Sequence, residues 1–216
     1  MHFEILVEDI SGKVALEHLF PKIASAEDTF NIHPYKGLGR IPKNIFKDKH
    51  PKARILLEQL PRLLRAYGKT HANYPDDYLA AVVVVCDLDQ KDFSTFLKEL
   101  NNTLQTCLPA PITRFCIAIE EGEAWLLGDL AAIKAAYPAA KKQVLDSYVN
   151  DSICGTWEVL ADAVYQGGAT ALKAKGSQAI GQEKSRWAEN ICPNMDIDTN
   201  NSPSFIHFRE AIRNLG

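Results

Sequence analysis

The chain has 216 residues, of which 46% are hydrophobic and 24% are charged, and its formal net charge is −3. This is the composition of a globular protein with a sizeable core. The net charge excludes a positive electrostatic potential over the whole surface, so any contact with nucleic acid must come from a local basic patch. No signal peptide precedes the first predicted strand, and no apolar run reaches membrane-spanning length. We therefore expect a cytoplasmic protein that has no contact with a membrane.

The five cysteines are widely spaced and include no C-x-x-C pair. This spacing argues against a zinc site built on cysteine pairs. Cys86 and Cys116 stand inside apolar runs, and we expect both to be buried thiols in a reducing compartment.

Strand and helix patterns alternate along the first part of the chain. The predicted strands span residues 2–9, 29–35, 78–87 and 113–121, and the predicted helices span 11–23, 52–68, 92–106 and 123–137. Pro61 should kink or divide the helix over 52–68. The run "YLAAVVVVCD" is apolar on both of its alternating faces, which is typical of a central parallel strand that is covered on both sides.

This order predicts an α/β fold with a mostly parallel four-stranded sheet flanked by helices. After about residue 129 the pattern is helical only, most clearly over 156–165 and 202–215, where Ser202 caps and Pro203 opens the helix. We therefore predict an α/β domain over residues 1–128 and an all-helical extension over 129–216 that packs on it.

Acidic residues follow three of the predicted strands. They are Glu8 and Asp9 after the first strand, Asp87 and Asp89 after the third, and Glu120, Glu121 and Glu123 after the fourth. In an open parallel sheet, ligands bind outside the carboxyl ends of the strands. These side chains should therefore converge at one edge of the sheet.

Two interpretations of this edge are open. Side chains alternate along a strand, so Asp87 and Asp89 are expected to point the same way, beside Glu8. Their repulsion would be relieved by a divalent cation that prefers oxygen ligands, Mg²⁺ or Mn²⁺. The simpler alternative is that the D-x-D sequence is a helix cap followed by a solvated loop residue.

The sequence resembles the Toprim fold, which is shared by topoisomerases, primase-type enzymes and nucleases of the overcoming-lysogenization-defect class. More closely, it is similar to an uncharacterised Toprim-related bacterial family, a domain of unknown function. The similar stretches are "ILVEDISGKVALE", "VVVCDLDQKD", "IEEGEAWLLGD", "GTWEVLADAVY" and "NNSPSFIHF", which lie between about residues 4 and 208.

The resemblance implies roles for individual residues. Glu8 takes the place of the Toprim glutamate, and Asp87 and Asp89 take the place of the metal-binding pair. Glu121 and Glu123 fall in the acidic segment before the tryptophan. The chain departs from many Toprim motifs at Asp9, which stands where those motifs have glycine.

Toprim enzymes cleave or join phosphodiesters, so the resemblance implies the same chemistry here. A metal held by Asp87 and Asp89 would polarise a phosphoryl oxygen or lower the pKa of a bound water. Glu8 would complete the metal site or act as general base. The candidate phosphate-binding cations are Lys13, Lys36, Arg40 and Lys43, although the loop that carries the last three could equally be a solvated turn.

Several further residues have a structural alternative. The acids of the segment 120–123 would also stabilise the start of the following helix through its dipole. The sequence "SGK" at residues 11–13 resembles the end of an ATP-binding loop, but the glycine that should precede it is missing, which argues against such a loop. The basic stretch of Lys173, Lys175 and Lys184 is better explained as a solvated helix face than as a phosphate-binding surface.

Two functions follow from these observations. The first is a Mg²⁺- or Mn²⁺-dependent nuclease or phosphodiesterase that acts on nucleic acid. The resemblance further suggests a role in bacterial defence or DNA repair with an ATPase partner. The second is a non-catalytic Toprim-like module that binds nucleic acid, a nucleotide or a protein partner. The sequence does not determine the oligomeric state.

Overall fold

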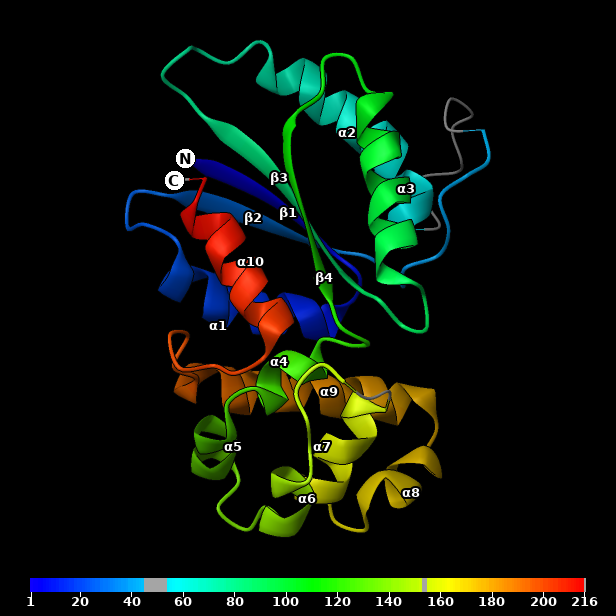
Figure 1. The fold of residues 1–216 in the computed structure, drawn as a ribbon, viewed down its shortest axis with the longest axis vertical. Coiled ribbons are helices and arrows are strands. Elements are labelled where there is room, and N and C mark those ends of the chain that lie inside the picture. Colours follow the sequence, from blue (N-terminus) through cyan, green and yellow to red (C-terminus); the bar gives the residue numbers. More distant parts are fainter. Residues whose placement is uncertain (45–53, 153–154, 216) are drawn as a thin grey trace.

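The computed structural model describes residues 1–44, 54–152 and 155–215. Its centre is a four-stranded sheet with the strand order β2-β1-β3-β4, and every pair of neighbouring strands is parallel (Figure 1). The strands are β1 (His2–Val7), β2 (Thr29–Pro34), β3 (Ala80–Asp87) and β4 (Ile112–Ala118). The predicted α/β fold with a parallel four-stranded sheet is therefore confirmed.

Strand β3 lies in the interior of the sheet, and its residues from Ala80 to Cys86 are all buried. Its side chains contribute to both faces of the sheet, which explains why the sequence of this strand has no polar alternation. Cys86 and Cys116 are buried and free, as the sequence predicted.

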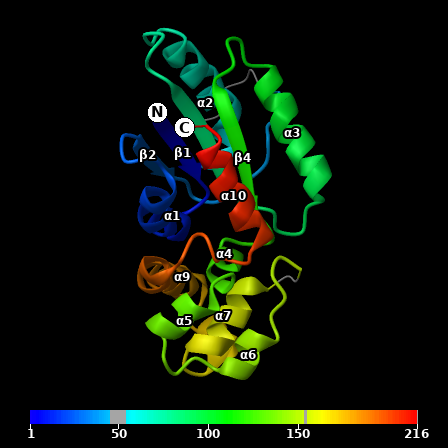
Figure 2. The same ribbon diagram turned by 60° about the vertical axis from the view of Figure 1, so that its left-hand side comes forward.

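Helices cover both faces of the sheet (Figures 1 and 2). Helices α2 (Leu56–His71) and α3 (Phe93–Gln105) pack on one face, and α1 (Ile10–Ile23) and α10 (Pro203–Arg213) pack on the other. Alternate residues of β1 separate the two layers, since Ile5 belongs to the apolar cluster of the second face and Leu6 to that of the first. Helix α10 thus returns the end of the chain to the sheet.

The remaining helices form a region beyond the carboxyl ends of the strands (Figure 2). They are α4 (Glu123–Leu127), α5 (Leu130–Ala136), α6 (Lys142–Asp146), α7 (Thr156–Val164), α8 (Gly168–Lys173), α9 (Ser177–Ile191) and the 3₁₀ turn η2 (Cys192–Asn194). Trp125, Leu160 and Trp187 of this region share one apolar cluster with Val85 of the sheet. This continuity holds the helical region against the edge where the acidic residues lie. The predicted boundary between residues 1–128 and 129–216 stays a prediction.

The structure corrects two predicted helices. The helix predicted over 123–137 is two helices, because Asp129 caps α5 by accepting a hydrogen bond from the backbone of Ala132 at 2.9 Å. Pro61 was expected to kink or divide its helix, but α2 runs undivided through it as far as His71. The first residues of that predicted helix, 52 and 53, lie outside the described part of the chain.

The predicted helix start at Ser202 is confirmed, since Ser202 caps α10 with Pro203 in the first turn. Asp92 caps α3 by accepting a hydrogen bond from the backbone N–H of Thr95. In the ranges 1–44, 54–152 and 155–215, no helix combines the length and apolar character needed to cross a membrane.

Candidate active site

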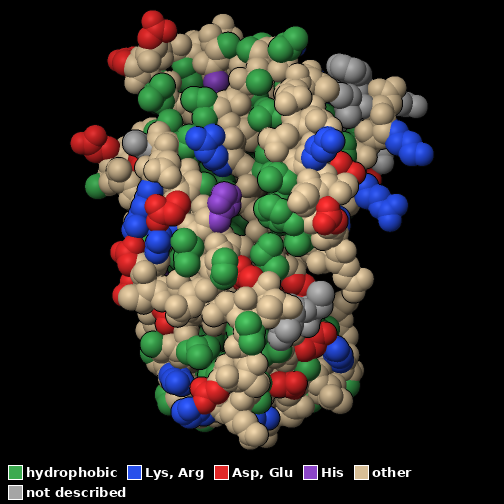
Figure 3. All heavy atoms as spheres, viewed as in Figure 1, with side chains coloured by type: hydrophobic (Ala, Val, Ile, Leu, Met, Phe, Trp, Pro, Cys, Tyr) green, Lys and Arg blue, Asp and Glu red, His purple; other side chains and the backbone are tan. Residues whose placement is uncertain are grey.

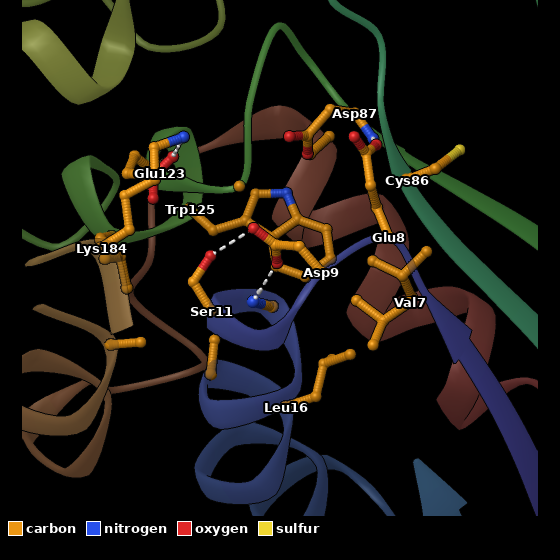
Figure 4. Close-up of a pocket in the computed structure, with 17 residues that line it drawn as sticks. Val7, Glu8, Asp9, Ser11, Leu16, Cys86, Asp87, Glu123, Trp125 and Lys184 are labelled. Carbon is orange, nitrogen blue, oxygen red and sulfur yellow. Dashed lines mark hydrogen bonds and ion pairs between the residues drawn. The ribbon is translucent and has the colours of Figure 1, made fainter. Parts of the chain in front are cut away.

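Glu8 and Asp87 meet at the carboxyl edge of the sheet. Strands β1 and β3 are hydrogen-bonded neighbours with Val7 opposite Val85, so each strand delivers its acid to the same place. The backbone N–H of Asp87 donates to Oε2 of Glu8 at 3.2 Å. Figure 4 shows the two carboxyl groups close together at the rim of one pocket. The predicted convergence of these two acids is thus present in the structure.

Their proximity has an electrostatic consequence. Burial, followed by the charges of Glu8 and Glu123, raises the pKa of Asp87 well above its usual value. Burial, together with the charges of Asp89 and Asp9, raises the pKa of Glu8 to about 7, although backbone hydrogen bonds from Asp87 and Leu38 act against this. The surroundings of Glu8 and Asp87 therefore disfavour the ionised form of both carboxyl groups, and a cation between them would stabilise that form.

Asp9, the departure from the Toprim pattern, has a structural role. It is the N-cap of α1, where its carboxylate accepts hydrogen bonds from Gly12 N and Ser11 Oγ, both at 2.7 Å. A Cβ atom on Gly12 would lie 2.6 Å from a methyl group of Val7, so a larger residue in this first turn of α1 would force Val7 to move. The start of α1 thus already has an anion, the carboxylate of Asp9.

Asp89 does not lie as the strand alternation predicted. Strand β3 ends at Asp87, and Asp89 adopts a left-handed conformation with φ of 50°. Its side chain is 55% exposed and pairs with Lys91, with 2.9 Å between Oδ2 and Nζ. The expectation that Asp87 and Asp89 point the same way because they share a strand is therefore wrong. Asp89 is still near enough for its charge to raise the pKa of Glu8.

Lys184 of α9 supplies a cation to the acidic edge. Its Nζ lies 3.0 Å from Oε2 of Glu123 and 3.2 Å from Oε1 of Glu121, and its side chain is only 14% exposed. Burial alone would lower the pKa of Lys184, but the charges of Glu123, Glu121 and Asp87 raise it far above its usual range. Lys184 is therefore a partly buried ammonium ion within an acidic pocket.

The acids of the segment 120–123 divide into two roles. Glu123 is buried in the first turn of α4, and burial raises its pKa even beside Lys184. Burial likewise raises the pKa of Glu121 to about 7. Glu120 turns away to the start of α7, where it accepts hydrogen bonds from Gly155 N and from both N and Oγ1 of Thr156.

The pocket between the sheet and the helical region is small. It has a volume of about 50 Å³ and is lined by Glu8, Asp9, Asp87, Glu123 and Lys184, with apolar walls that include Trp125. Figure 4 shows that Trp125 lies between the Glu8–Asp87 pair and the Glu123–Lys184 pair. Such a volume accommodates an ion with a few waters but no nucleotide. A larger substrate must therefore approach from outside the pocket.

The predicted phosphate-binding cations lie elsewhere. Lys13 pairs with Glu17 on α1, at 3.1 Å. Lys36, Arg40 and Lys43 are exposed in the loop after β2, and Arg40 borders a separate groove. None of the four lines the acidic pocket. Their role in phosphate binding stays a prediction.

The donor set of this edge fits Mg²⁺ or Mn²⁺. The described residues contain no group of three His, Cys, Asp or Glu side chains arranged to hold a metal ion. Mg²⁺ does not require one, because it usually retains several waters and is held by one or two carboxylates together with substrate phosphates. Glu8 and Asp87 provide that pair of carboxylates, and burial together with nearby negative charges raises the pKa of each.

Sequence reasoning missed Lys184, because it assigned the basic stretch around it to a solvated helix face. Lys173 and Lys175 do extend outward, to Glu158 and Tyr165. Lys184 lies on the same side of α9 as Trp187, three residues later, which is fully buried. That spacing of a lysine and a buried tryptophan on one helix was the available signal.

Comparisons with protein-family models, with curated proteins and with solved structures found no match to this chain. The four-stranded parallel α/β fold and the geometry of its acidic edge are therefore the basis for any functional assignment.

Proposed function

We propose that this chain is a Mg²⁺- or Mn²⁺-dependent phosphodiesterase of the Toprim class, and that its substrate is nucleic acid. One observation carries the proposal. Glu8 and Asp87, from neighbouring parallel strands, share one edge where burial and nearby carboxylate charges raise both pKa values. Groups with such shifted pKa values cluster at sites of catalysis and metal binding.

In this proposal Glu8 and Asp87 hold the metal. Asp89 would give up its ion pair with Lys91 and add its own carboxylate as a third ligand. The Asp89–Lys91 pair is exposed, so its rupture costs at most about 1 kcal/mol. The bound metal would polarise a phosphoryl oxygen and lower the pKa of a water.

Protonation of Glu8 and the charge of Lys184 both affect the proposed metal site. Glu8 holds the metal as a carboxylate, so metal binding would displace the proton that its raised pKa of about 7 favours in the metal-free protein. Lys184 offsets part of the negative charge from the side of the helical region, through Glu121 and Glu123. We assign these two acids to positioning Lys184, which differs from the role of metal ligand that the resemblance implied for them.

One observation favours the alternative of a non-catalytic module. Lys184 already neutralises part of the acidic pocket, whose volume is only about 50 Å³. A protein of this kind would retain the fold and bind nucleic acid, a nucleotide or a protein partner without cleaving it. The ATPase partner and the role in bacterial defence or DNA repair remain predictions from the resemblance.

A nuclease assay separates the two functions. Purified protein is incubated with single-stranded DNA, duplex DNA and RNA in the presence of Mg²⁺, Mn²⁺ or EDTA. We expect metal-dependent cleavage that the substitution Asp87→Asn abolishes, with the variant still folded by circular dichroism. A folded wild-type protein that cleaves none of these substrates with either metal would exclude the enzymatic proposal.

A further inference from the structure

A second, larger cavity is bordered by the loop after β2 and by helices α2 and α3. It is a groove of about 490 Å³, which we call the Arg40–Lys91 groove, and it is bordered by Arg40, Ile41, Leu57, Lys91, Phe96 and Asn102. Its volume is within the range of small-ligand sites, about 300–1,000 Å³. The acidic pocket is too small for a nucleotide, whereas this groove is large enough.

Two interactions connect the residues around the groove with the carboxyl edge of the sheet. The loop after β2 that carries Arg40 is fixed by a hydrogen bond from Gly37 N to the backbone oxygen of Glu8, at 3.0 Å. On the other side, Lys91 contacts Asp89 at 2.9 Å. A ligand in the groove would therefore contact Lys91, the ion-pair partner of Asp89.

The lining of the groove combines cations with apolar side chains. Arg40 and Lys91 can bind phosphate, and Lys91 lies over the ring of Phe96 with 5.2 Å between Nζ and the ring centroid. Ile41 is partly exposed and adds apolar surface, whereas Leu57 and Phe96 are each only 2% exposed. Glu99 and Asn102 add a carboxylate and an amide. In Figure 3, Lys and Arg side chains (blue) gather over and beside α3, the helix that carries Phe96.

We propose that the Arg40–Lys91 groove binds one unstacked nucleotide of a single-stranded nucleic acid, with phosphate on Arg40 and Lys91 and the base against the partly exposed side chain of Ile41. The proposal rests on the proposed function, since it places the adjacent phosphodiester at the edge formed by Glu8 and Asp87. Bases inside a duplex are stacked and could not reach the apolar lining. The substrate class is therefore single-stranded rather than duplex nucleic acid.

The test is a binding experiment without cleavage. Fluorescence anisotropy in EDTA measures the affinity of the full-length chain for a short fluorescein-labelled oligothymidylate, with unlabelled duplex and thymidine monophosphate as competitors. The double variant Arg40→Ala/Lys91→Ala is compared with Lys69→Ala/Lys98→Ala, which removes two exposed lysines outside the groove. Urea denaturation establishes that both double variants are folded.

We expect the groove variant to bind the oligothymidylate about ten-fold more weakly, and the salt slope of log K to become shallower by about 1.4, for two lost phosphate contacts. The matched control should stay within about two-fold of the wild type. Equal losses in the two double variants would overturn the proposal, because they would show a non-specific charge effect. Duplex that competes as well as single strand, or monophosphate that competes as well as oligonucleotide, would also overturn it.

The outcome is separable from that of the proposed function. If the Asp87→Asn protein binds oligothymidylate through the groove and the wild type cleaves nothing, the groove assignment stands and the enzymatic proposal fails. If the wild type cleaves single-stranded DNA and the groove variant does so with an unchanged KM, the enzymatic proposal stands and the groove assignment fails.

Discussion

Lys184 in α9 and Glu123 in α4 form an ion pair at 3.0 Å in which the two side chains are only 14% and 6% exposed. The pair joins two helices of the region that lies against the carboxyl edge of the sheet. It therefore links the stability of the helical region to the electrostatics of the acidic pocket.

Substitution of Lys184 by methionine should destabilise the fold. The apolar stem is retained, but Glu121 and Glu123 lose the cation that both contact, and removal of one partner of a buried pair costs about 3–5 kcal/mol. The free energy of unfolding from urea denaturation at pH 8 measures the effect. Lys173→Met is the matched control, because Lys173 is 55% exposed and its pair with Glu158 should contribute less than about 1 kcal/mol. A loss no larger than that of the control would contradict the assignment of Lys184 as a partly buried cation.

Glu8 should make the metal-free protein more stable in mild acid than in mild base. Its pKa in the fold is raised to about 7, above the usual value for a glutamate, so the folded state binds the proton more tightly than the unfolded state. The stability contributed by this proton is present in full below the unfolded pKa and is lost as the pH rises through about 7. Urea denaturation in EDTA between pH 5 and pH 8 should show this decline.

The substitution Glu8→Gln should flatten that part of the profile, because the amide does not titrate. Glu17→Gln serves as the control, since Glu17 is 49% exposed and pairs with Lys13 away from the pocket. The assignment of the decline to Glu8 is wrong if both variants keep the slope of the wild type.

Asp87→Asn should stabilise the metal-free protein while it removes the proposed activity. The carboxylate of Asp87 is disfavoured by burial and by the charges of Glu8 and Glu123, so a neutral amide of the same size relieves repulsion. We expect the free energy of unfolding in EDTA at pH 8 to rise by about 1 kcal/mol. A marked loss of stability would show that Asp87 has a structural role in the fold.

Glu120→Ala should destabilise the protein without any effect on metal binding. Its carboxylate caps α7 by accepting hydrogen bonds from Thr156 N and Oγ1, both at 2.7 Å, and loss of a cap costs about 1–2 kcal/mol. Urea denaturation and a Mn²⁺ titration measure the two properties. A loss of Mn²⁺ affinity in the folded variant would place Glu120 in the site instead.

The sheet and the position of its acidic edge could be predicted because they follow from local patterns. The long apolar run of β3 identifies a central parallel strand, and parallel strands bring their carboxyl ends to one side. The orientation of Asp89 could not be predicted, since it depends on where β3 stops and on a single left-handed residue. The split between α4 and α5 depends likewise on the side chain of Asp129 as a cap.

The local sequence offers only a weak signal for the cation in the pocket, the i, i+3 spacing of Lys184 and Trp187. Lys184 is 63 residues from Glu121, and its neighbours in sequence are polar and charged like those of an exposed helix. Its environment arises only when α9 packs beside α4 and against the edge of the sheet. Long-range packing therefore determines which of the many lysines belongs to the site.

The most direct test of the account is Mn²⁺ binding, measured by electron paramagnetic resonance of the free ion during titration at pH 8. We predict one bound Mn²⁺ per chain in the wild type, with Glu8→Gln and Asp87→Asn each weakening binding by at least about ten-fold, and Mg²⁺ in competition for the same site. Wild-type protein that is folded and leaves all of the Mn²⁺ free, or variants that bind it as tightly as the wild type, would contradict the claim that Glu8 and Asp87 share a divalent cation.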